Sequence, residues 1–194
     1  MPNLPITQKQ ALELVKKYNS EERDLIHYLE SEAIMGEVAE KLGEDVEYWG
    51  MLGLLHDLDW GLTKDNVETH LTKVPEILKD VGFDDEFIEI ILSHGYGFME
   101  LPALQDKKRE KKVEFALAAC ETLTGLIHAY ALMRGGKISD METKGLKKKF
   151  KDKAFAAGCE REIIKEAENF MDFDEFLKCG IEGIKKIKGE VGLE

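Results

Sequence analysis

Hydrophobic residues recur along this chain every three or four positions, and the strict alternation typical of half-buried strands is almost absent. Local signals mark some helix ends: Thr7 is placed to cap a first helix, and Gly43 follows a long second one. The periodicity predicts helices over about residues 8–19, 22–42, 46–57, 70–81, 84–95, 113–133, 141–155, 159–171 and 173–188. Residues 60–69 are predicted to form a loop. Because no internal repeat, linker or low-complexity tract interrupts the pattern, we predict one all-α domain over residues 1–194.

Acidic residues outnumber basic ones by 39 to 27, which gives a formal net charge of −12. A surface this acidic repels nucleic-acid backbones at long range, so general nucleic-acid binding is not expected. A small phosphorylated substrate stays compatible, because a bound metal ion reverses the local field. The hydrophobic content of 43% is that of an ordinary globular protein rather than a disordered one.

Three scattered cysteines, Cys120, Cys159 and Cys179, form no C-x-x-C pair and suit free thiols in a reducing compartment. The first ten residues, MPNLPITQKQ, lack the basic and apolar segments of a signal peptide. No apolar run looks long enough and free enough of charge to span a bilayer. We therefore expect a cytoplasmic protein without a membrane association.

Four of the five histidines lie on apolar faces of separate predicted helices: His27, His56, His70 and His94. His70, for example, shares its predicted face with Val74, Ile77 and Val81. A single histidine of this kind is usually a packed, hydrogen-bonded core residue. Four of them are harder to explain in that way, because each buried imidazole needs partners for both ring nitrogens. A shared metal ion satisfies several imidazoles at once.

Two acidic residues strengthen this interpretation. Asp57 directly follows His56 at the end of an apolar helix, and Glu121 lies inside the long apolar segment 113–133. A buried carboxylate without a partner costs several kcal/mol, so a cation or a strong donor is expected nearby. The alternatives are that Asp57 faces solvent at its helix end and that Glu121 forms a salt bridge. A mixed set of histidines and carboxylates suits Mn, Fe, Ni, Co or Zn, and the sequence does not choose among them.

The order His27, then His56-Asp57, then Glu121 resembles the H…HD…D signature of the HD-domain phosphohydrolases. The resemblance covers about residues 24–165. Within the family, the chain is most similar to a small stand-alone bacterial and archaeal subgroup of HDIG type. It is carried by the segments HYLESEAIMGEVAEKLGED, WGMLGLLHDLDW, ILSH, ETLTGLIHAYAL and KKKFKDKAFAAGCERE. It implies an HD-domain helical bundle with its core over about residues 22–133 and C-terminal helices over about 141–188 packed on that core.

By this resemblance, one metal ion is held by four ligands: His27, His56, Asp57 and Glu121. Glutamate replaces the family's final aspartate, and its extra methylene moves the carboxylate by roughly a bond length. Binuclear members of the family carry further histidines between the HD pair and the last acid. His70 and His94 occupy such places, where they are second-metal ligands, substrate-facing acids or bases, or core residues. Asp59 is close enough in sequence to orient a ligand imidazole or to be an ordinary loop residue.

The implied activity is hydrolysis of a nucleotide or other small phosphate ester, as a phosphomonoesterase or a phosphodiesterase, by a metal-activated water. Asp57, His70 and His94 are the candidate catalytic residues. Four basic residues are candidates for binding the substrate phosphate or, alternatively, form a solvated face: Lys149, Lys151, Lys153 and Arg161. The alternatives to a hydrolase are a metal-binding regulatory or scaffold HD protein without turnover, a metal-free helical interaction module and a metal-dependent oxygenase. The sequence leaves the oligomeric state open.

Overall fold

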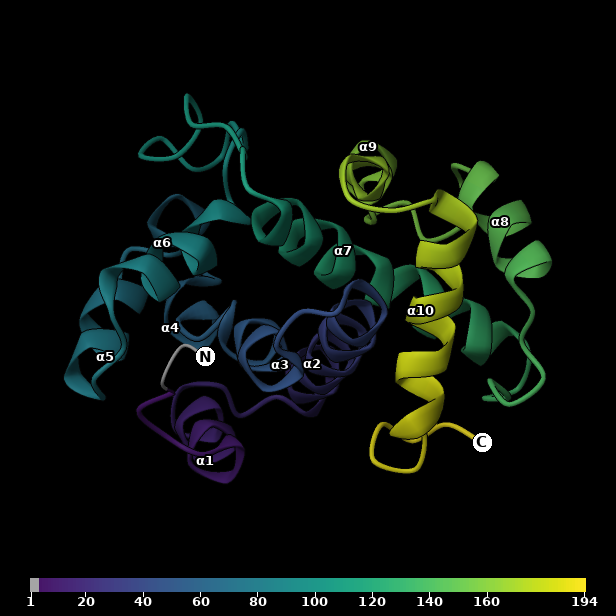
Figure 1. Ribbon diagram of the computed structural model, residues 1–194, viewed down its shortest axis with the longest axis horizontal. Coiled ribbons are helices and arrows are strands. Elements are labelled where there is room, and N and C mark those ends of the chain that lie inside the picture. The colour runs from purple at the N-terminus through teal and green to yellow at the C-terminus, as the bar shows by residue number, and fades with distance from the viewer. Residues whose placement is uncertain (1–3) are drawn as a thin grey trace.

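The computed structural model describes residues 4–194, and within them it is helical and contains no strand (Figure 1). The first six α-helices are α1 (Gln8–Tyr18), α2 (Glu22–Leu42), α3 (Val46–Leu55), α4 (Trp60–Thr63), α5 (Val74–Asp80) and α6 (Asp85–Ser93). The remaining four are α7 (Lys112–Met133), α8 (Thr143–Lys151), α9 (Arg161–Lys165) and α10 (Phe173–Lys186). Two short 3₁₀-helices are η1 (Val67–Thr69) and η2 (Glu166–Asn169). The predicted all-α fold class is confirmed.

Helix ends that carry a local capping signal agree with the predicted boundaries. The Thr7 hydroxyl accepts a hydrogen bond from the backbone N–H of Gln10, and the Gln10 side chain accepts one from the Thr7 N–H. Gly43 ends α2 in the left-handed conformation, with φ of 72°. The Asp84 carboxylate accepts from the Phe87 N–H at the start of α6. These contacts involve only neighbouring residues, so the sequence is sufficient to predict them.

The predicted helix over residues 70–81 is too long, because α5 begins at Val74. Leu71 has a φ of 66°, a left-handed conformation that interrupts a helix at this point. His70 therefore precedes the helix and does not share a helical face with Val74. Residues 60–69 contain α4 and η1 rather than a continuous loop. The predicted helix over 141–155 shortens to Thr143–Lys151, and the one over 159–171 becomes α9 followed by η2.

Helix α2 packs against α3, α7 and α10, and together these helices enclose much of the core (Figure 1). Two glycines permit the backbones of α3 and α10 to approach that of α2 closely. A Cβ atom on Gly53 of α3 would lie 2.5 Å from the Ser31 carbonyl oxygen, and one on Gly183 of α10 would lie 2.8 Å from the Ala33 carbonyl oxygen. Neither position therefore accepts a larger residue without moving the helices apart.

Helix α7 corrects the expectation that no segment is apolar enough to cross a bilayer. An 18-residue window of this helix has a mean hydropathy of 1.3, so by length and composition alone it passes that test. In the fold, 56% of that window is buried. Helix α7 packs against α2, α6, α8 and α9, and the core of a helical protein accounts for its composition.

Candidate metal centre

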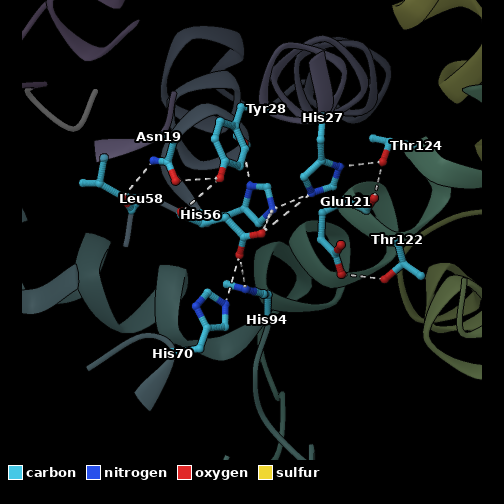
Figure 2. Close-up of polar contacts among 12 residues, drawn as sticks. Asn19, His27, Tyr28, His56, Leu58, His70, His94, Glu121, Thr122 and Thr124 are labelled. Carbon is cyan, nitrogen blue, oxygen red and sulfur yellow. Dashed lines mark hydrogen bonds and ion pairs between the residues drawn. The ribbon is translucent and has the colours of Figure 1, made fainter. Parts of the chain in front are cut away.

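Four imidazoles from four parts of the chain lie together (Figure 2), and each has its Nε2 atom within 3.9 Å of the carboxylate of Asp57. His27 comes from α2, His56 follows the last residue of α3, His70 precedes α5, and His94 follows the last residue of α6. We call these five residues the metal centre. The sequence predicted that His27, His56 and Asp57 lie together, and it raised His70 and His94 as further members. The structure brings all five together.

Each carboxylate oxygen of Asp57 faces one pair of imidazoles. Oδ2 lies 3.9 Å from His27 Nε2 and 3.5 Å from His56 Nε2. Oδ1 lies 3.1 Å from His70 Nε2 and 3.1 Å from His94 Nε2. Within each of the resulting triads, the three potential ligand atoms all lie within 4.8 Å of one another. The residues are thus arranged as two adjacent candidate sites that share Asp57.

The backbone determines which nitrogen of His56 and of His94 carries the proton. The Nδ1 atom of His56 lies 2.8 Å from the Gly53 carbonyl oxygen, and that of His94 lies 2.7 Å from the Ile91 carbonyl oxygen. A carbonyl oxygen only accepts hydrogen bonds, so Nδ1 must donate in both residues. In the neutral imidazole the lone pair is then on Nε2, and it is directed into the metal centre.

Side chains impose the same orientation on His27 and His70. The Thr124 hydroxyl donates to the Glu121 carbonyl oxygen at 2.6 Å, which leaves its oxygen to accept from His27 Nδ1 at 2.8 Å. The buried carboxylate of Asp59 accepts from His70 Nδ1 at 3.0 Å. The sequence suggested that Asp59 could orient a ligand imidazole, and this hydrogen bond to His70 fits that role. All four histidines thus direct Nε2 towards Asp57.

The Nε2 atoms of His27 and His56 lie only 3.0 Å apart. Because both Nδ1 protons are already donated elsewhere, two lone pairs would face each other at this distance, and only a proton or a metal cation between them relieves the repulsion. Burial lowers the pKa of both imidazoles, that of His56 to about 3, so a proton is disfavoured at neutral pH. A divalent cation between the two nitrogens would relieve the repulsion, and the ligand set fits such an ion.

We call His27, His56 and Asp57 the first triad, and Asp57, His70 and His94 the second triad. The protonation of the histidines differs between the two. Burial opposes ionisation of Asp57, but the neighbouring imidazoles of His56 and His70 hold its pKa well below the usual range. Burial also opposes protonation of His70, yet the carboxylates of Asp57 and Asp59 raise its pKa to about 10. In the metal-free protein His70 is therefore an imidazolium, and metal binding at this triad must displace the proton on its Nε2.

The metal centre opens towards solvent on the side of His27. The His27 side chain is 29% exposed and that of Asp57 18%, whereas that of His56 is 1% exposed. The side chains of His70 and His94 are 9% and 8% exposed. A substrate and a water molecule would therefore reach the ligands past His27, which suits a catalytic site with an open position better than a closed structural one.

Glu121, expected as the fourth ligand of the first metal, is in neither triad. Its carboxylate accepts a hydrogen bond from the Thr122 hydroxyl at 2.5 Å, and Figure 2 shows this group turned towards Thr122. Burial raises the pKa of Glu121 to about 7. The residue still supports the first triad through its backbone, because its carbonyl oxygen accepts from Thr124, the partner of His27.

The lysines offered as phosphate ligands lie away from the metal centre. Lys149 and Lys151 belong to α8, and Lys153 follows that helix. Figure 1 shows α8 beyond α10, at the opposite side of the molecule from α4 and α6. The Lys149 ammonium lies 4.7 Å from the centre of the Phe155 ring, which gives it a partner within the chain.

The guanidinium of Arg161 donates all its hydrogen bonds to backbone carbonyl groups of the chain. Its Nε donates to the Phe150 carbonyl oxygen at 3.0 Å, and Nη1 donates to those of Ala156 and Cys159 at 3.0 and 2.6 Å. Nη2 donates to the carbonyl oxygens of Asp152 and Phe155. These five bonds account for every N–H of a guanidinium, so Arg161 has no donor left for a substrate phosphate.

Sequence reasoning missed a hub formed by Asn19 and Tyr28 beside the metal centre (Figure 2). Asn19 Nδ2 donates to the Leu58 carbonyl oxygen at 3.0 Å, and its Oδ1 accepts from the Gly61 N–H at 2.7 Å. The Tyr28 hydroxyl lies 3.1 Å from the same Oδ1 and 3.3 Å from the Asp57 carbonyl oxygen. An asparagine after a helix is common, so no local signal indicated that Asn19 positions the backbone around Asp57.

Comparison with known proteins identifies the class to which this chain belongs. The sequence profile of the HD domain matches residues 24–120, and the chain therefore belongs to the HD-domain family. That stretch contains all five residues of the metal centre. No curated protein and no solved structure matches the chain. HD-domain proteins are generally metal-dependent phosphohydrolases.

Acid is expected to destabilise the metal-free protein. Burial lowers the pKa of His56 from 6.5 to about 3, so between these values the unfolded chain binds a proton at His56 that the folded chain does not. The free energy of unfolding should fall by roughly 1.4 kcal/mol per pH unit through this group as the pH drops below 6.5. His70 does not offset the loss, because its raised pKa keeps it protonated in both states over this range.

Urea unfolding of the metal-free protein at about pH 7 and about pH 5 measures this effect. A His56→Gln variant removes the titrating group, and its free energy of unfolding should change less between the two pH values. An equal change in both proteins would show that His56 is not the group responsible.

Proposed function

We propose that this protein is a phosphohydrolase that uses a divalent metal, Mn, Fe, Ni, Co or Zn, to hydrolyse a nucleotide or another small phosphate ester. The observation that carries the proposal is the convergence of four imidazole Nε2 atoms on one partly buried carboxylate, that of Asp57. His27, His56 and Asp57 would hold one ion, and Asp57, His70 and His94 a second. A bound divalent ion supplies a Lewis acid for a phosphoryl oxygen and lowers the pKa of a water molecule.

The chain's own residues supply position and access. Hydrogen bonds at Nδ1 hold each imidazole ring with Nε2 towards the centre, so little movement of the rings is needed when a metal and a substrate bind, although His70 must first lose its Nε2 proton. His27 is the most exposed of the four imidazoles and would face an incoming phosphate group, and the low exposure of the other three imidazoles keeps bulk water away from them. If only one ion binds, the Nε2 atoms of His70 and His94 stay free to hold a proton for the leaving group.

A second candidate function is a metal-binding regulatory or scaffold protein without turnover. It is favoured by one observation, the Glu121 carboxylate that bonds to Thr122 instead of joining a triad. Metal occupancy without activity on any phosphate ester would support this alternative.

Elemental mass spectrometry of the purified protein is the first test, carried out beside a His56→Ala/Asp57→Ala double variant. We expect about two equivalents of a transition metal per chain and their loss in the double variant, since Asp57 belongs to both triads. A Lys151→Ala/Lys153→Ala double variant, altered on the exposed surface, should keep its metal. Screening the metal-loaded proteins against phosphomonoesters and phosphodiesters then separates the two kinds of esterase. A chain that takes up no metal even after reconstitution would contradict the proposal.

Three narrower points stay predictions. They are membership of the small stand-alone bacterial and archaeal subgroup, a cytoplasmic location, and a small phosphorylated substrate as the partner instead of a nucleic acid. The subgroup rests on sequence segments on both sides of the HD pair, and the substrate class rests on the net charge and on the candidate metal centre.

A further inference from the structure

Arg109 is a buried arginine outside the metal centre, at the end of the segment that joins α6 to α7. Its side chain is only 6% exposed. Nη1 lies 2.9 Å from the Ser93 carbonyl oxygen, 3.1 Å from that of His94 and 3.0 Å from that of Tyr96. Ser93 is the last residue of α6 and the other two residues follow it, so these carbonyl groups lie at the C-terminal end of the helix, which favours a positive charge. Arg109 thus holds the backbone of a candidate metal ligand, His94.

The other side of the same guanidinium binds the C-terminal part of the chain. Nε and Nη2 of Arg109 donate to the two carboxylate oxygens of Glu166, at 2.6 and 2.9 Å. Glu166 begins η2, which packs against α7 and lies outside the stretch matched by the HD profile. This geometry needs the planar fork of arginine, because one lysine ammonium cannot bond in parallel to a carboxylate and also reach three carbonyl groups.

The His94 ring is held by two polar contacts. Its Nδ1 bonds to the Ile91 carbonyl oxygen within its own helical turn, and its Nε2 faces Asp57 Oδ1 at 3.1 Å. The ring therefore moves with the last turn of α6. The carbonyl groups at that turn are the ones that Arg109 binds, so a shift of the guanidinium would be transmitted to Nε2 without breaking the Nδ1 bond.

We propose that Arg109, anchored by Glu166, is a positioning residue for His94, and that through this pair the C-terminal segment sets the affinity of the second metal triad. The inference rests on the metal-dependent function proposed above. It assigns the C-terminal segment a role at the metal centre although the segment supplies no ligand. The first triad, His27, His56 and Asp57, has no contact with Arg109 and should bind its ion as before.

The test compares four Mn-loaded variants with the wild type: Arg109→Gln, Arg109→Lys, Glu166→Gln and Arg161→Gln. Arg161→Gln is the matched control, because Arg161 also binds backbone carbonyl groups but at residues 150–159, away from His94. Metal titration with elemental mass spectrometry gives the number of ions and their affinities. Electron paramagnetic resonance distinguishes isolated Mn from a coupled pair. Thermal unfolding identifies variants that are only less stable.

We expect two ions in the wild type and in Arg161→Gln. In Arg109→Gln the second ion should bind at least tenfold more weakly, as is common when a group that orients a metal ligand is removed, while the first ion is retained. Arg109→Lys should not restore it, and Glu166→Gln should weaken it less. The inference is overturned if Arg109→Gln and Arg109→Lys keep both ions at wild-type affinity, if Arg161→Gln loses the second ion equally, or if the wild type binds one ion. A wild type that binds none contradicts the proposed function as well.

Discussion

Replacing Asp57 with asparagine is expected to remove both metal ions and to lower phosphohydrolase activity by ~10³-fold or more, equivalent to about 4 kcal/mol of transition-state stabilisation. The reason is that Asp57 is shared: one oxygen faces His27 and His56, and the other faces His70 and His94. An amide keeps the shape of the side chain but removes the negative charge that balances a divalent cation. It also replaces one acceptor oxygen by an N–H donor.

Metal content and activity are measured together on Asp57→Asn, His27→Ala and His70→Ala. We expect the asparagine variant to lose both ions, whereas each histidine variant should lose chiefly the ion of its own triad. Asp140→Asn is the control, because Asp140 is an exposed acid that pairs with Arg134 and has no contact with the metal centre. Retention of one ion by Asp57→Asn would mean that the triads are independent. Full activity without metal would contradict the proposed chemistry.

Replacing Gly53 with alanine is expected to lower the free energy of unfolding by about 3 kcal/mol. A Cβ atom there would lie 2.5 Å from the Ser31 carbonyl oxygen, 2.7 Å from its carbonyl carbon and 2.9 Å from the Glu32 nitrogen. All three are backbone atoms of α2, so no side-chain rotation relieves the contact and the two helices must separate. The variant should also bind metal more weakly, because the Gly53 carbonyl oxygen accepts from His56 Nδ1.

Gly50→Ala, one helical turn earlier, is the matched control for this substitution. Its Cβ would meet only the Glu32 side chain at 3.6 Å and carbonyl oxygen at 3.7 Å, which are ordinary contacts. Because alanine favours a helix over glycine by about 1 kcal/mol, this variant should be as stable as the wild type or slightly more so. Urea unfolding of the metal-loaded proteins provides both values. Equal stability of the two variants would show that the close approach of α2 and α3 does not limit the fold.

Local interactions account for the part of the fold that was predictable. Thr7, Gly43 and Asp84 mark helix ends through contacts with residues a few positions away, and the structure places those ends as predicted. The same helical spacing indicated that His27 and His56 face inward. Where a boundary depends on the surroundings, the prediction was wrong, as at His70, which precedes α5 in a segment held by the distant carboxylate of Asp59.

The sequence by itself determined the all-helical class, the inward direction of His27 and His56 and the pairing of His56 with Asp57, because helical periodicity and adjacency along the chain contain that information. Only the tertiary structure decided which groups meet. It turned Glu121 towards Thr122, engaged Arg161 with backbone carbonyl groups and brought Arg109 to the end of α6. Arg109 joins residues far apart in the chain, and this contact is set by how the helices pack. Glu121 and Arg161 bond to residues close in sequence, but which of several possible partners each side chain takes depends on the packing around it and not on the spacing of residues along one helix.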